Sequence, residues 1–538
     1  MGIDTQRSRR AALRRSTFGR LTLLLALALG GPTDPPYAVR AQAEPGPGAV
    51  DPIWLPVLLR AAQVSGLPTP AVRATGLPSA TPPAEPTAGS TLEPTQVPGP
   101  TAGTTAEPSP GPPAGPDPAA CAAIPSFDDG LTPRRELHVT VDGDDDGGDG
   151  SEAHPFASLG RAAREARPGT AIRLHPGRHA GGSYLEDLRG EPGAPIWLGG
   201  LPGAARPRIE GGATGLHLVR PSWLVVHDLE LAGAEANGLN VDDGGAVDDA
   251  TAAEHLVLRD LDIHDVGAGG NQDCLKLSGT RMLQVLDSRF ARCGGGGSGI
   301  DMVGAHQALV ARSVFEAMGA NAIQVKGGSR DVEIRWNRMR EGGARVVNLG
   351  GSTGFDFFRP PLDPTGENAE ARDVRLLANV IEGGDTPWAF VGCVDCLVAQ
   401  NTVVEPGVWL MRILQETSTG GGFTFAPARG GRVVNNLFVF RRARLRSDVN
   451  VGGGTAPETF GFEHNLWYAL DAPDRSAPSL PTVERGGLSG RDPLLGAEGR
   501  IPAESPAAGA GRAGAWAPGD LNGACWADPP AIGAFEAP

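Results

Sequence analysis

The sequence predicts an all-β fold, a β-solenoid in which short strands stack coil upon coil. Between Asp273 and Gly351 the chain repeats a glycine-ended segment of alternating apolar and polar residues: DCLKLSG, SGIDMVGA, NAIQVKGG and ARVVNLGG. Alternation with a period of two is a strand signal, and glycine marks the turn that follows. A second strand type recurs after 25 and then 24 residues, at Phe290, Phe315 and Met339. A fixed period of this length in strand-only repeats is typical of a solenoid.

Stacking would place equivalent residues of neighbouring coils about 4.8 Å apart. The apolar members of the glycine-ended strands should then point inward: Leu275 and Leu277, Ile300 and Met302, Ile323 and Val325, Val347 and Leu349. The residues between them should form one outward column: Lys276, Asp301, Gln324 and Asn348, flanked by Asp273, Lys326 and Arg345. This column is charged and mixed in sign, and we interpret it as the functional face.

Composition restricts the functions that the chain can have. The 538 residues are 40% hydrophobic but only 5% aromatic, which suits a core of stacked Leu, Val and Ile. The net charge of −15 and the lack of a long basic run outside the N-terminus argue against nucleic-acid binding. An acidic polysaccharide would need local positive charge, which Lys276, Lys326, Arg345 and Arg412 supply on the predicted face.

Residues 1–43 have the features of an export signal. A basic region containing Arg9 and Arg10 precedes the apolar run LTLLLALALGG, which is too short to span a bilayer, and Ala41-Gln42-Ala43 is a plausible cleavage site. The mature protein is therefore expected to be secreted or cell-surface, without a transmembrane span; the Sec and Tat routes both stay open. Residues 44–120, rich in Pro, Thr and Ala, are predicted to be a disordered linker.

The folded domain is predicted to cover residues 121–538. It begins with an acidic loop, a short helix at 157–167, a Pro-Gly turn and the strand AIRLHPG. This order resembles the N-terminal cap of right-handed parallel β-helix proteins of the pectate lyase-like superfamily, including polysaccharide lyases of family nine. The resemblance implies a right-handed parallel β-helix with a short N-terminal capping helix, and we expect a monomer. Further along, Asn337, Asn379, Asn401 and Asn436 indicate an asparagine ladder that satisfies turn backbone groups.

Six cysteines in an exported chain suggest disulfides. Cys274 and Cys293 are 19 residues apart, nearly one coil, so stacking is expected to bring them together. The other pairings stay open: Cys393 and Cys396 would close a small loop, and Cys121 and Cys525 pair only by elimination. A zinc site at CVDC is the alternative, but it lacks two further ligands.

One candidate metal site is acidic. The carboxylates Asp242, Asp243, Asp248 and Asp249, with Asp273 one coil later, are hard oxygen ligands of the kind that calcium prefers. The family resemblance implies the same ion, because calcium-dependent lyases of this fold bind the substrate carboxylate through such a cluster. A solvated acidic turn is the alternative interpretation.

A second candidate site is basic. The segments NAIQVKGG and EGGARVVNLGG resemble the active coils of the chondroitinase B and alginate lyase group. That resemblance implies that Lys326 and Arg345, 19 residues apart, flank a uronate and act in catalysis. The glutamate calcium ligands of that group are missing here, since Gly319 and Asn321 occupy the region. The alternative is an ordinary exposed lysine at a turn.

Other residues fit a glycan-binding cleft. The pair Asp301 and Asp273 would serve a glycosidase. A long loop carries Phe357 and Arg359, which we expect to form a wall against a sugar ring, and Arg412 and Glu416 should lie on or near the same face.

The sequence therefore predicts a polysaccharide-active protein, a lyase that cleaves a uronate-containing chain by β-elimination. Two alternatives remain: a non-catalytic carbohydrate-binding or cell-surface protein, and a glycoside hydrolase. The sequence names neither the polymer nor the metal.

Overall fold

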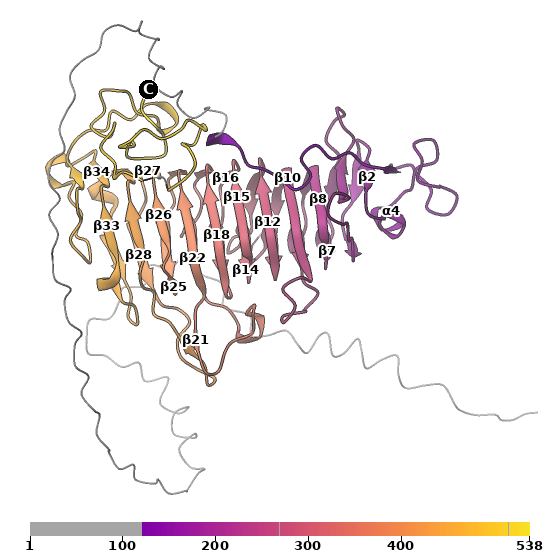
Figure 1. Ribbon diagram of the computed structural model, residues 1–538, viewed down its shortest axis with the longest axis horizontal. Helices are drawn as coiled ribbons and strands as arrows, with labels where there is room; N and C mark the ends of the chain where they lie inside the picture. The colour runs from indigo at the N-terminus through magenta and orange to yellow at the C-terminus, as the bar shows by residue number, and fades with distance from the viewer. Residues whose placement is uncertain (1–120, 268, 515) are drawn as a thin grey trace, which may run out of the picture. The chain divides into compact units, whose positions relative to one another are not determined.

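The chain winds into coils of three short strands, and each strand pairs in parallel with its equivalent in the next coil. This computed structural model describes residues 121–267, 269–514 and 516–538 (Figure 1). The predicted signal peptide and linker lie outside the described residues. Two short strands, β21 (Glu367–Asn368) and β29 (Thr424–Phe425), pair with each other. Every other strand joins a neighbouring coil, so these strands form long parallel sheets, and the fold is a parallel β-helix.

The first sheet, called sheet 1 below, carries the glycine-ended strands. Its ten strands stack in chain order. They are β4 (Ser183–Glu186), β7 (Thr214–Val219), β9 (Asn237–Asp242), β11 (Asp273–Ser278), β14 (Ser298–Val303), β17 (Asn321–Lys326), β20 (Val347–Gly350), β24 (Trp388–Val391), β28 (Trp409–Leu414) and β32 (Ser447–Val451).

Two further ladders, sheets 2 and 3, complete each coil and share the long strands β8 (Ser222–Ala232) and β10 (Ala253–Val266). The remaining strands of sheet 2 are β1 (Arg135–Val139), β2 (Thr170–Leu174), β5 (Ile196–Gly200), β12 (Thr280–Leu286), β15 (His306–Ala311), β18 (Ser329–Arg335), β22 (Ala371–Leu377), β25 (Cys393–Val394), β26 (Leu397–Ala399), β30 (Arg432–Val434) and β33 (Gly461–Glu463). Those of sheet 3 are β3 (Arg178–Ala180), β6 (Arg208–Glu210), β13 (Arg289–Cys293), β16 (Val314–Glu316), β19 (Arg338–Arg340), β23 (Val380–Glu382), β27 (Thr402–Val404), β31 (Leu437–Phe440), β34 (Leu466–Ala469) and β35 (Leu488–Ser489).

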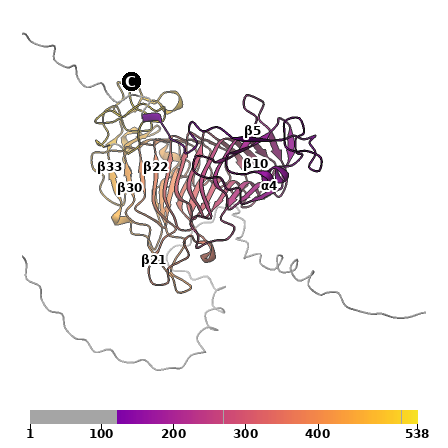
Figure 2. The ribbon, with the colours of Figure 1, turned by 45° about the vertical axis from the view of Figure 1, so that its right-hand side comes forward.

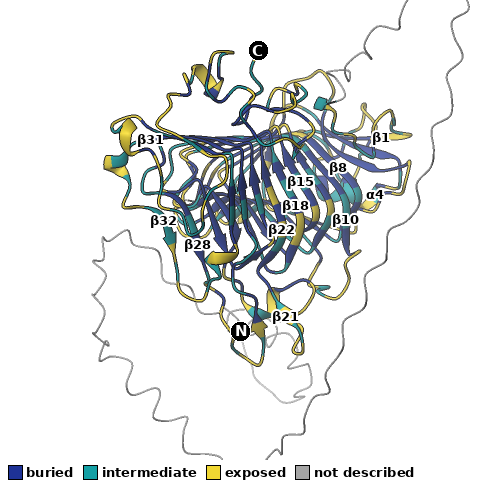
Figure 3. Ribbon diagram, turned by 60° about the vertical axis from the view of Figure 1, so that its left-hand side comes forward, coloured by how far each residue is buried: buried dark blue, intermediate teal, exposed yellow. Residues whose placement is uncertain are grey.

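The predicted register and core are confirmed. Leu275 pairs with Ile300, Ile300 with Ile323, and Ile323 with Val347. All four side chains are fully buried in one core, which the strands enclose along the whole helix (Figure 3). Phe290 and Phe315 also stack, with ring centroids 5.0 Å apart. The alternation in the sequence therefore places apolar residues inside, as the solenoid prediction required.

The predicted asparagine ladder is present at the turn between sheets 2 and 3. The Oδ1 atoms of Asn379, Asn401 and Asn436 each accept hydrogen bonds from both the backbone N–H and the Nδ2 of the preceding member. Ser313 extends the ladder at one end and Asn465 at the other. Each of these residues follows one with φ between 50° and 60°, a conformation that is unfavourable for a side-chain-bearing residue. The ladder satisfies the backbone groups of this strained turn.

Short segments cover the ends and one flank of the coils. α4 (Leu159–Glu165) lies within the range predicted to be helical, and Ser158 accepts a hydrogen bond from its first turn. Leu159 and Ala162 of α4 are buried in the main core, beside the first coils (Figure 2). The C-terminal tail packs apolar residues such as Ile501 and Phe535 on the outside of the later coils. The short helices are η1 (Phe355–Phe357), η2 (Arg442–Arg444), η3 (Pro457–Thr459), η4 (Pro473–Arg475) and η5 (Ala497–Gly499).

Three disulfides join the six cysteines. Cys274 and Cys293 are bonded, as predicted, with Cα atoms 5.5 Å apart. They belong to β11 and β13 of the same coil, so the bond closes one coil instead of joining two stacked ones. The two pairings left open by the sequence are Cys121–Cys525 and Cys393–Cys396. Within the described residues, no helix is long and apolar enough to cross a membrane.

The asparagine ladder predicts a large effect for one substitution. Asn401→Ala should leave the buried N–H of Asn379 without an acceptor, at a cost of about 1–3 kcal/mol in the free energy of unfolding. Chemical denaturation followed by circular dichroism measures the change. Gln307→Ala, which removes an exposed amide in β15, is the control and should change stability little. Equal stability of the two variants would contradict a structural role for the ladder.

Candidate functional site

The outward column of sheet 1 extends over more strands than the sequence predicted. Strand register places Lys276 beside Asp301, Asp301 beside Gln324, and Gln324 beside Asn348, as expected. The same register continues toward the N-terminus through Asn240, His217 and Tyr184. It continues toward the C-terminus through Ala389, Arg412 and Asn450. The column therefore joins all ten strands of the sheet.

A groove of about 590 Å³ lies over the N-terminal part of this column. Its floor comes from six neighbouring strands: β4, β7, β9, β11, β14 and β17. One wall comes from residues 352–359, in the long loop that follows β20. The lining residues are Tyr184, His217, Val219, Asp242, Asp243, Gly244, Gly245, Lys276, Ser278, Val303, Lys326, Ser352, Thr353, Gly354, Phe357 and Arg359.

Two lysines meet at one buried carboxylate beside the groove. Lys276 Nζ donates to Asp301 Oδ2 in a short ion pair, and it lies 3.6 Å from Asp273 Oδ2. Lys326 Nζ lies 3.6 Å from the same Asp301 Oδ2 and 3.5 Å from Gln324 Oε1. The Asp301 side chain is only 1% exposed, whereas those of Lys276 and Lys326 are 23% and 14% exposed. A ligand in the groove therefore meets the ammonium groups and not the carboxylate between them.

The buried charges shift one another's titration. Burial raises the pKa of Asp273 to about 6, and the charge of Asp301 adds to the rise. Burial also acts to raise the pKa of Asp301, but the charges of Lys276 and Lys326 outweigh it and lower that pKa. Burial acts to lower the pKa of Lys276, but the charges of Asp301 and Asp273 outweigh it and raise the pKa to about 12. Lys276 is thus an ammonium throughout the physiological range.

Composition singles out the same two residues. The chain contains 47 basic residues, and only two of them, Lys276 and Lys326, are lysines. Both line the groove and both contact Asp301. Arginine supplies every other basic side chain apart from histidine. This signal was available in the sequence, and it was missed there because lysine and arginine were counted together.

A buried glutamate supports the turn after Lys326. Glu370 Oε2 accepts hydrogen bonds from the N–H of Gly327, at 3.0 Å, and from Thr353 Oγ1, at 2.7 Å. Its other oxygen accepts bonds from Thr353 N–H, at 2.9 Å, and from Thr417 Oγ1. Glu370 therefore joins the end of β17 to the loop that forms the groove wall.

The pairing of Lys326 with Arg345 is not formed. Arg345 N–H donates to the carbonyl of Ala320, just before β17, whereas Lys326 is the last residue of that strand. The five-residue separation along a strand corresponds to about 17 Å. Arg345 forms an ion pair with Glu416, and neither residue lines the groove. The sequence spacing was nearly one coil, but Lys326 ends β17, whereas Arg345 lies two residues before β20 begins.

The predicted calcium ligands do not converge. Asp243 binds Arg359 through both oxygens, at 2.8 and 3.0 Å, and Asp242 contacts His217. Asp273 accepts a bond from Ser298 N–H and lies beside Lys276. Asp248 and Asp249 are exposed. No group of three His, Cys, Asp or Glu among the described residues is placed to hold a metal ion, so this arrangement does not fit calcium.

The remaining predicted residues divide between the groove and its surroundings. Phe357 lines the groove and is 61% exposed, while the guanidinium of Arg359 is occupied by Asp243. Asn348 is buried in the column. Arg412 lies in the C-terminal part of the column, where its guanidinium stacks on Trp409 at 4.3 Å and donates to Asn450.

Sequence reasoning missed Tyr184 and His217. Their rings meet edge to face at 4.9 Å, and His217 Nε2 lies 2.5 Å from Asp242 Oδ2. Tyr184 is 57% exposed. Tyr184 and Phe357 are the two exposed aromatic residues in the described part of the chain, and both line the groove. The segment TGLHLV has the same alternation as the glycine-ended strands, so extending the column would have found His217.

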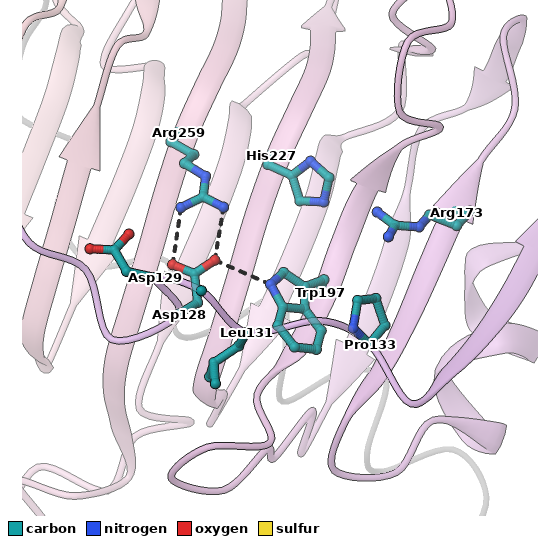
Figure 4. Close-up of a pocket in the computed structure, with 9 residues that line it drawn as sticks. Asp128, Asp129, Leu131, Pro133, Arg173, Trp197, His227 and Arg259 are labelled. Atoms are coloured by element: carbon teal, nitrogen blue, oxygen red, sulfur yellow. Dashed lines mark hydrogen bonds and ion pairs between the residues drawn. The ribbon is translucent and has the colours of Figure 1, made fainter.

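A second cavity, of about 340 Å³, lies on the outer face of sheet 2 under the segment 128–133 (Figure 4). Asp128 binds both guanidinium nitrogens of Arg259, at 3.0 and 2.8 Å, and accepts a bond from Trp197 Nε1. His227 contacts Asp228, and Arg173 donates to Glu136. Since these groups pair with one another, we interpret the cavity as the attachment of the N-terminal segment to the sheet.

The raised pKa of Asp273 predicts how stability depends on pH. A carboxyl group that titrates near 6 when folded and 3.8 when unfolded stabilises the fold below pH 3.8, and this contribution is lost as pH rises through about 6. The side chain of the Asp273→Asn variant is neutral at every pH, so this variant should not lose that contribution to stability. The free energy of unfolding of this variant, minus that of the parent, should therefore increase by up to about 3 kcal/mol between pH 4 and 7.5.

Chemical denaturation at several pH values measures this difference. Asp287→Asn, which removes an exposed turn carboxylate paired with Arg312, is the control for the loss of a carboxylate that is not buried. A difference for Asp273→Asn that is flat or falls with pH would contradict the assigned titration.

Comparisons with known proteins identify no family. No family model matches the chain, and no curated protein matches it. Similar solved structures include pectate lyase Pel9A, at 16% identity and a TM-score of 0.47, covering 78% of this chain and 100% of that one. An alginate lyase from Paenibacillus sp. str. FPU-7 is 14% identical with a TM-score of 0.40, covering 60% and 99%. A GH136 lacto-N-biosidase from Eubacterium ramulus is 14% identical with a TM-score of 0.39, covering 66% and 67%. Since these scores are below 0.5, the fold assignment depends on the strand pairing described above.

Proposed function

We propose that the protein binds an acidic polysaccharide in the groove of sheet 1 and cleaves it at a uronate by β-elimination. The observation that carries the proposal is the meeting of the chain's two lysines at the buried Asp301, beside a groove that also contains the exposed rings of Tyr184 and Phe357. Ammonium groups attract the carboxylates of such a polymer, and exposed rings pack against the apolar faces of sugars.

Lys276 suits the task of charge neutralisation. Two carboxylates hold it as an ammonium, and part of its side chain reaches the groove. An ammonium beside the uronate carboxylate stabilises the negative charge that develops when the proton at C5 is removed. Because Lys276 cannot give up its own proton in this environment, it is not the base.

Lys326 is the group that would remove the proton. Its ammonium has one carboxylate contact, at 3.6 Å, where Lys276 has two. As the neutral amine it would take the C5 proton, the electrons of that C–H bond would form the C4–C5 double bond, and the C4–O bond would break. The departing oxygen takes a proton from water. An arginine could not perform this step because its guanidinium stays protonated, which accounts for a lysine at this position.

Calcium has no part in this scheme. The carboxylates predicted to bind it are paired with Arg359, His217 and Lys276, and no step is derived through a metal ion.

Export is part of the proposal. Three disulfides within the described residues suit an oxidising compartment, such as the outside of the cell. We propose a secreted or cell-surface protein that acts as a monomer, as the sequence indicates.

Polysaccharide binding without cleavage is the second candidate function. The contact between Lys326 and Asp301 favours it, because an ammonium beside a carboxylate is a good ligand for an acidic sugar and a poor base. A hydrolase that uses Asp273 and Asp301 is less favoured. Their side chains are 2% and 1% exposed, whereas catalytic carboxyl groups of glycosidases contact the scissile bond.

Substitution of Lys326 separates these functions. The parent protein should release unsaturated products from at least one member of a panel of uronate polymers, measured by their ultraviolet absorbance. Lys326→Ala should abolish product formation and retain the fold, and Lys326→Arg should not restore activity.

Arg281→Ala is the matched control, since it removes a partly buried cation on sheet 2, away from the groove, and should retain full activity. A Lys326→Ala variant as active as the parent would refute the assignment of the base. A parent that binds uronate polymers but cleaves none would establish the binding function instead.

A further inference from the structure

The groove is long enough for several sugar residues. Its lining residues come from six adjacent strands of sheet 1, from Tyr184 in β4 to Lys326 in β17. Five inter-strand spacings correspond to about 24 Å along the axis of the helix. The two lysines occupy one half, on β11 and β17, and Tyr184 and His217 occupy the other, on β4 and β7. A polysaccharide that lies along the groove would therefore contact both halves at once.

The two halves differ in charge. Near the lysines, the groups that reach the groove are ammonium groups, because Asp301 and Asp273 are buried beneath them. In the other half, the carboxylate of Asp242 lines the groove, and Glu186 Oε1 lies 3.3 Å from the hydroxyl of Tyr184, which also lines it. Asp243 does not contribute, because Arg359 neutralises it.

Asp242 is held in its charged form. Burial acts to raise its pKa, but hydrogen bonds from His217, from the backbone of Gly244 and from Asn240 outweigh burial and lower that pKa. Its partners His217 and Asn240 are the column residues of β7 and β9, so they fix the carboxylate in the groove. Glu186 forms an ion pair with Arg220, which also pairs with Asp187, so one guanidinium serves two carboxylates.

We infer that the groove selects a polysaccharide in which the uronate alternates with a sugar that carries no carboxylate, over a polymer of uronate alone. The inference rests on the proposed function and specifies its substrate class. The uronate lies at Lys276 and Lys326, and the uncharged sugar lies against Tyr184 and His217, beside Asp242.

The physical reason is electrostatic. A homopolymer of uronate would place one of its carboxylates beside Asp242 and Glu186 whenever another reached the lysines. Like charges brought together in a partly buried groove repel each other, so they act against the wrong polymer while the aromatic contact favours the right one. An alternating polymer carries a carboxylate on only every second sugar, so it can place an uncharged sugar beside Asp242 and keep the contact with the aromatic ring.

The test measures binding by the Lys326→Ala protein, which keeps the polymers intact, with isothermal titration calorimetry. The probes form two matched pairs: polygalacturonate against the alternating galacturonate–rhamnose backbone, and polyglucuronate against hyaluronan, which alternates glucuronate with N-acetylglucosamine. In at least one pair the alternating polymer should bind about tenfold more tightly or better. Combining Asp242→Asn with Lys326→Ala should remove most of this difference in affinity, because the homopolymer should then bind more tightly.

Two controls keep the result interpretable. Asp287→Asn, which removes a carboxylate outside the groove, should leave the preference unchanged, and circular dichroism should show that every variant is folded.

Tyr184→Ala tests the same half of the groove through an exposed side chain whose loss should not affect folding. It should weaken binding of a hexasaccharide of the preferred polymer several-fold and leave a disaccharide unaffected, because only the longer chain reaches from the lysines to β4.

The outcomes separate the inference from the proposed function. The inference would be overturned by equal binding of both members of each pair, or by a preference for the homopolymers that Asp242→Asn does not change. Either result would leave the proposed uronate binding intact. If the folded protein binds no uronate polymer, the proposed function fails, and the inference fails with it.

Discussion

Parallel hydrogen bonding between successive coils is the constraint on which the rest of the structure depends. It fixes equivalent side chains of neighbouring coils about 4.8 Å apart, whatever their charge. Adjacent side chains in a column must therefore be compatible in charge. Two lysines on adjacent coils would repel each other strongly at that distance. Here Asp301 occupies the coil between Lys276 and Lys326, and its buried carboxylate contacts both. The spacing of the backbone thus explains why the positive charges of the groove are built around a negative one.

The sequence was sufficient for the parts of the structure that repeat. Alternation and glycine turns located the strands, the inward residues and the column, because all coils use the same local pattern. The asparagine ladder was predictable for the same reason. Arg345 was misplaced because its distance from Lys326 was counted along the chain. Aligned by pattern, ARVVNLGG and NAIQVKGG put Arg345 opposite Asn321, at the start of the strand.

The parts that do not repeat could not be predicted in this way. Arg359 reaches Asp243 across 116 residues of sequence because the loop after β20 folds back over earlier coils. This contact removes a carboxylate from the predicted calcium site and builds a wall of the groove at the same time. No periodic pattern contains such a contact, so the acidic cluster was interpreted without its partners. The chemistry of the groove is decided largely by these long-range pairs.

The Cys121–Cys525 disulfide determines how the β-helix would carry mechanical load. It spans 404 residues, which include every strand of the structure. Tension applied through the chain that precedes Cys121 would pass directly through the sulfur atoms into the C-terminal tail. The covalent path therefore bypasses the coils, and β1, the outermost strand, would not be peeled from its neighbour first. The groove lies between two ends that are covalently joined, so a pull on a bound polymer would be shared by the coils on both sides of it.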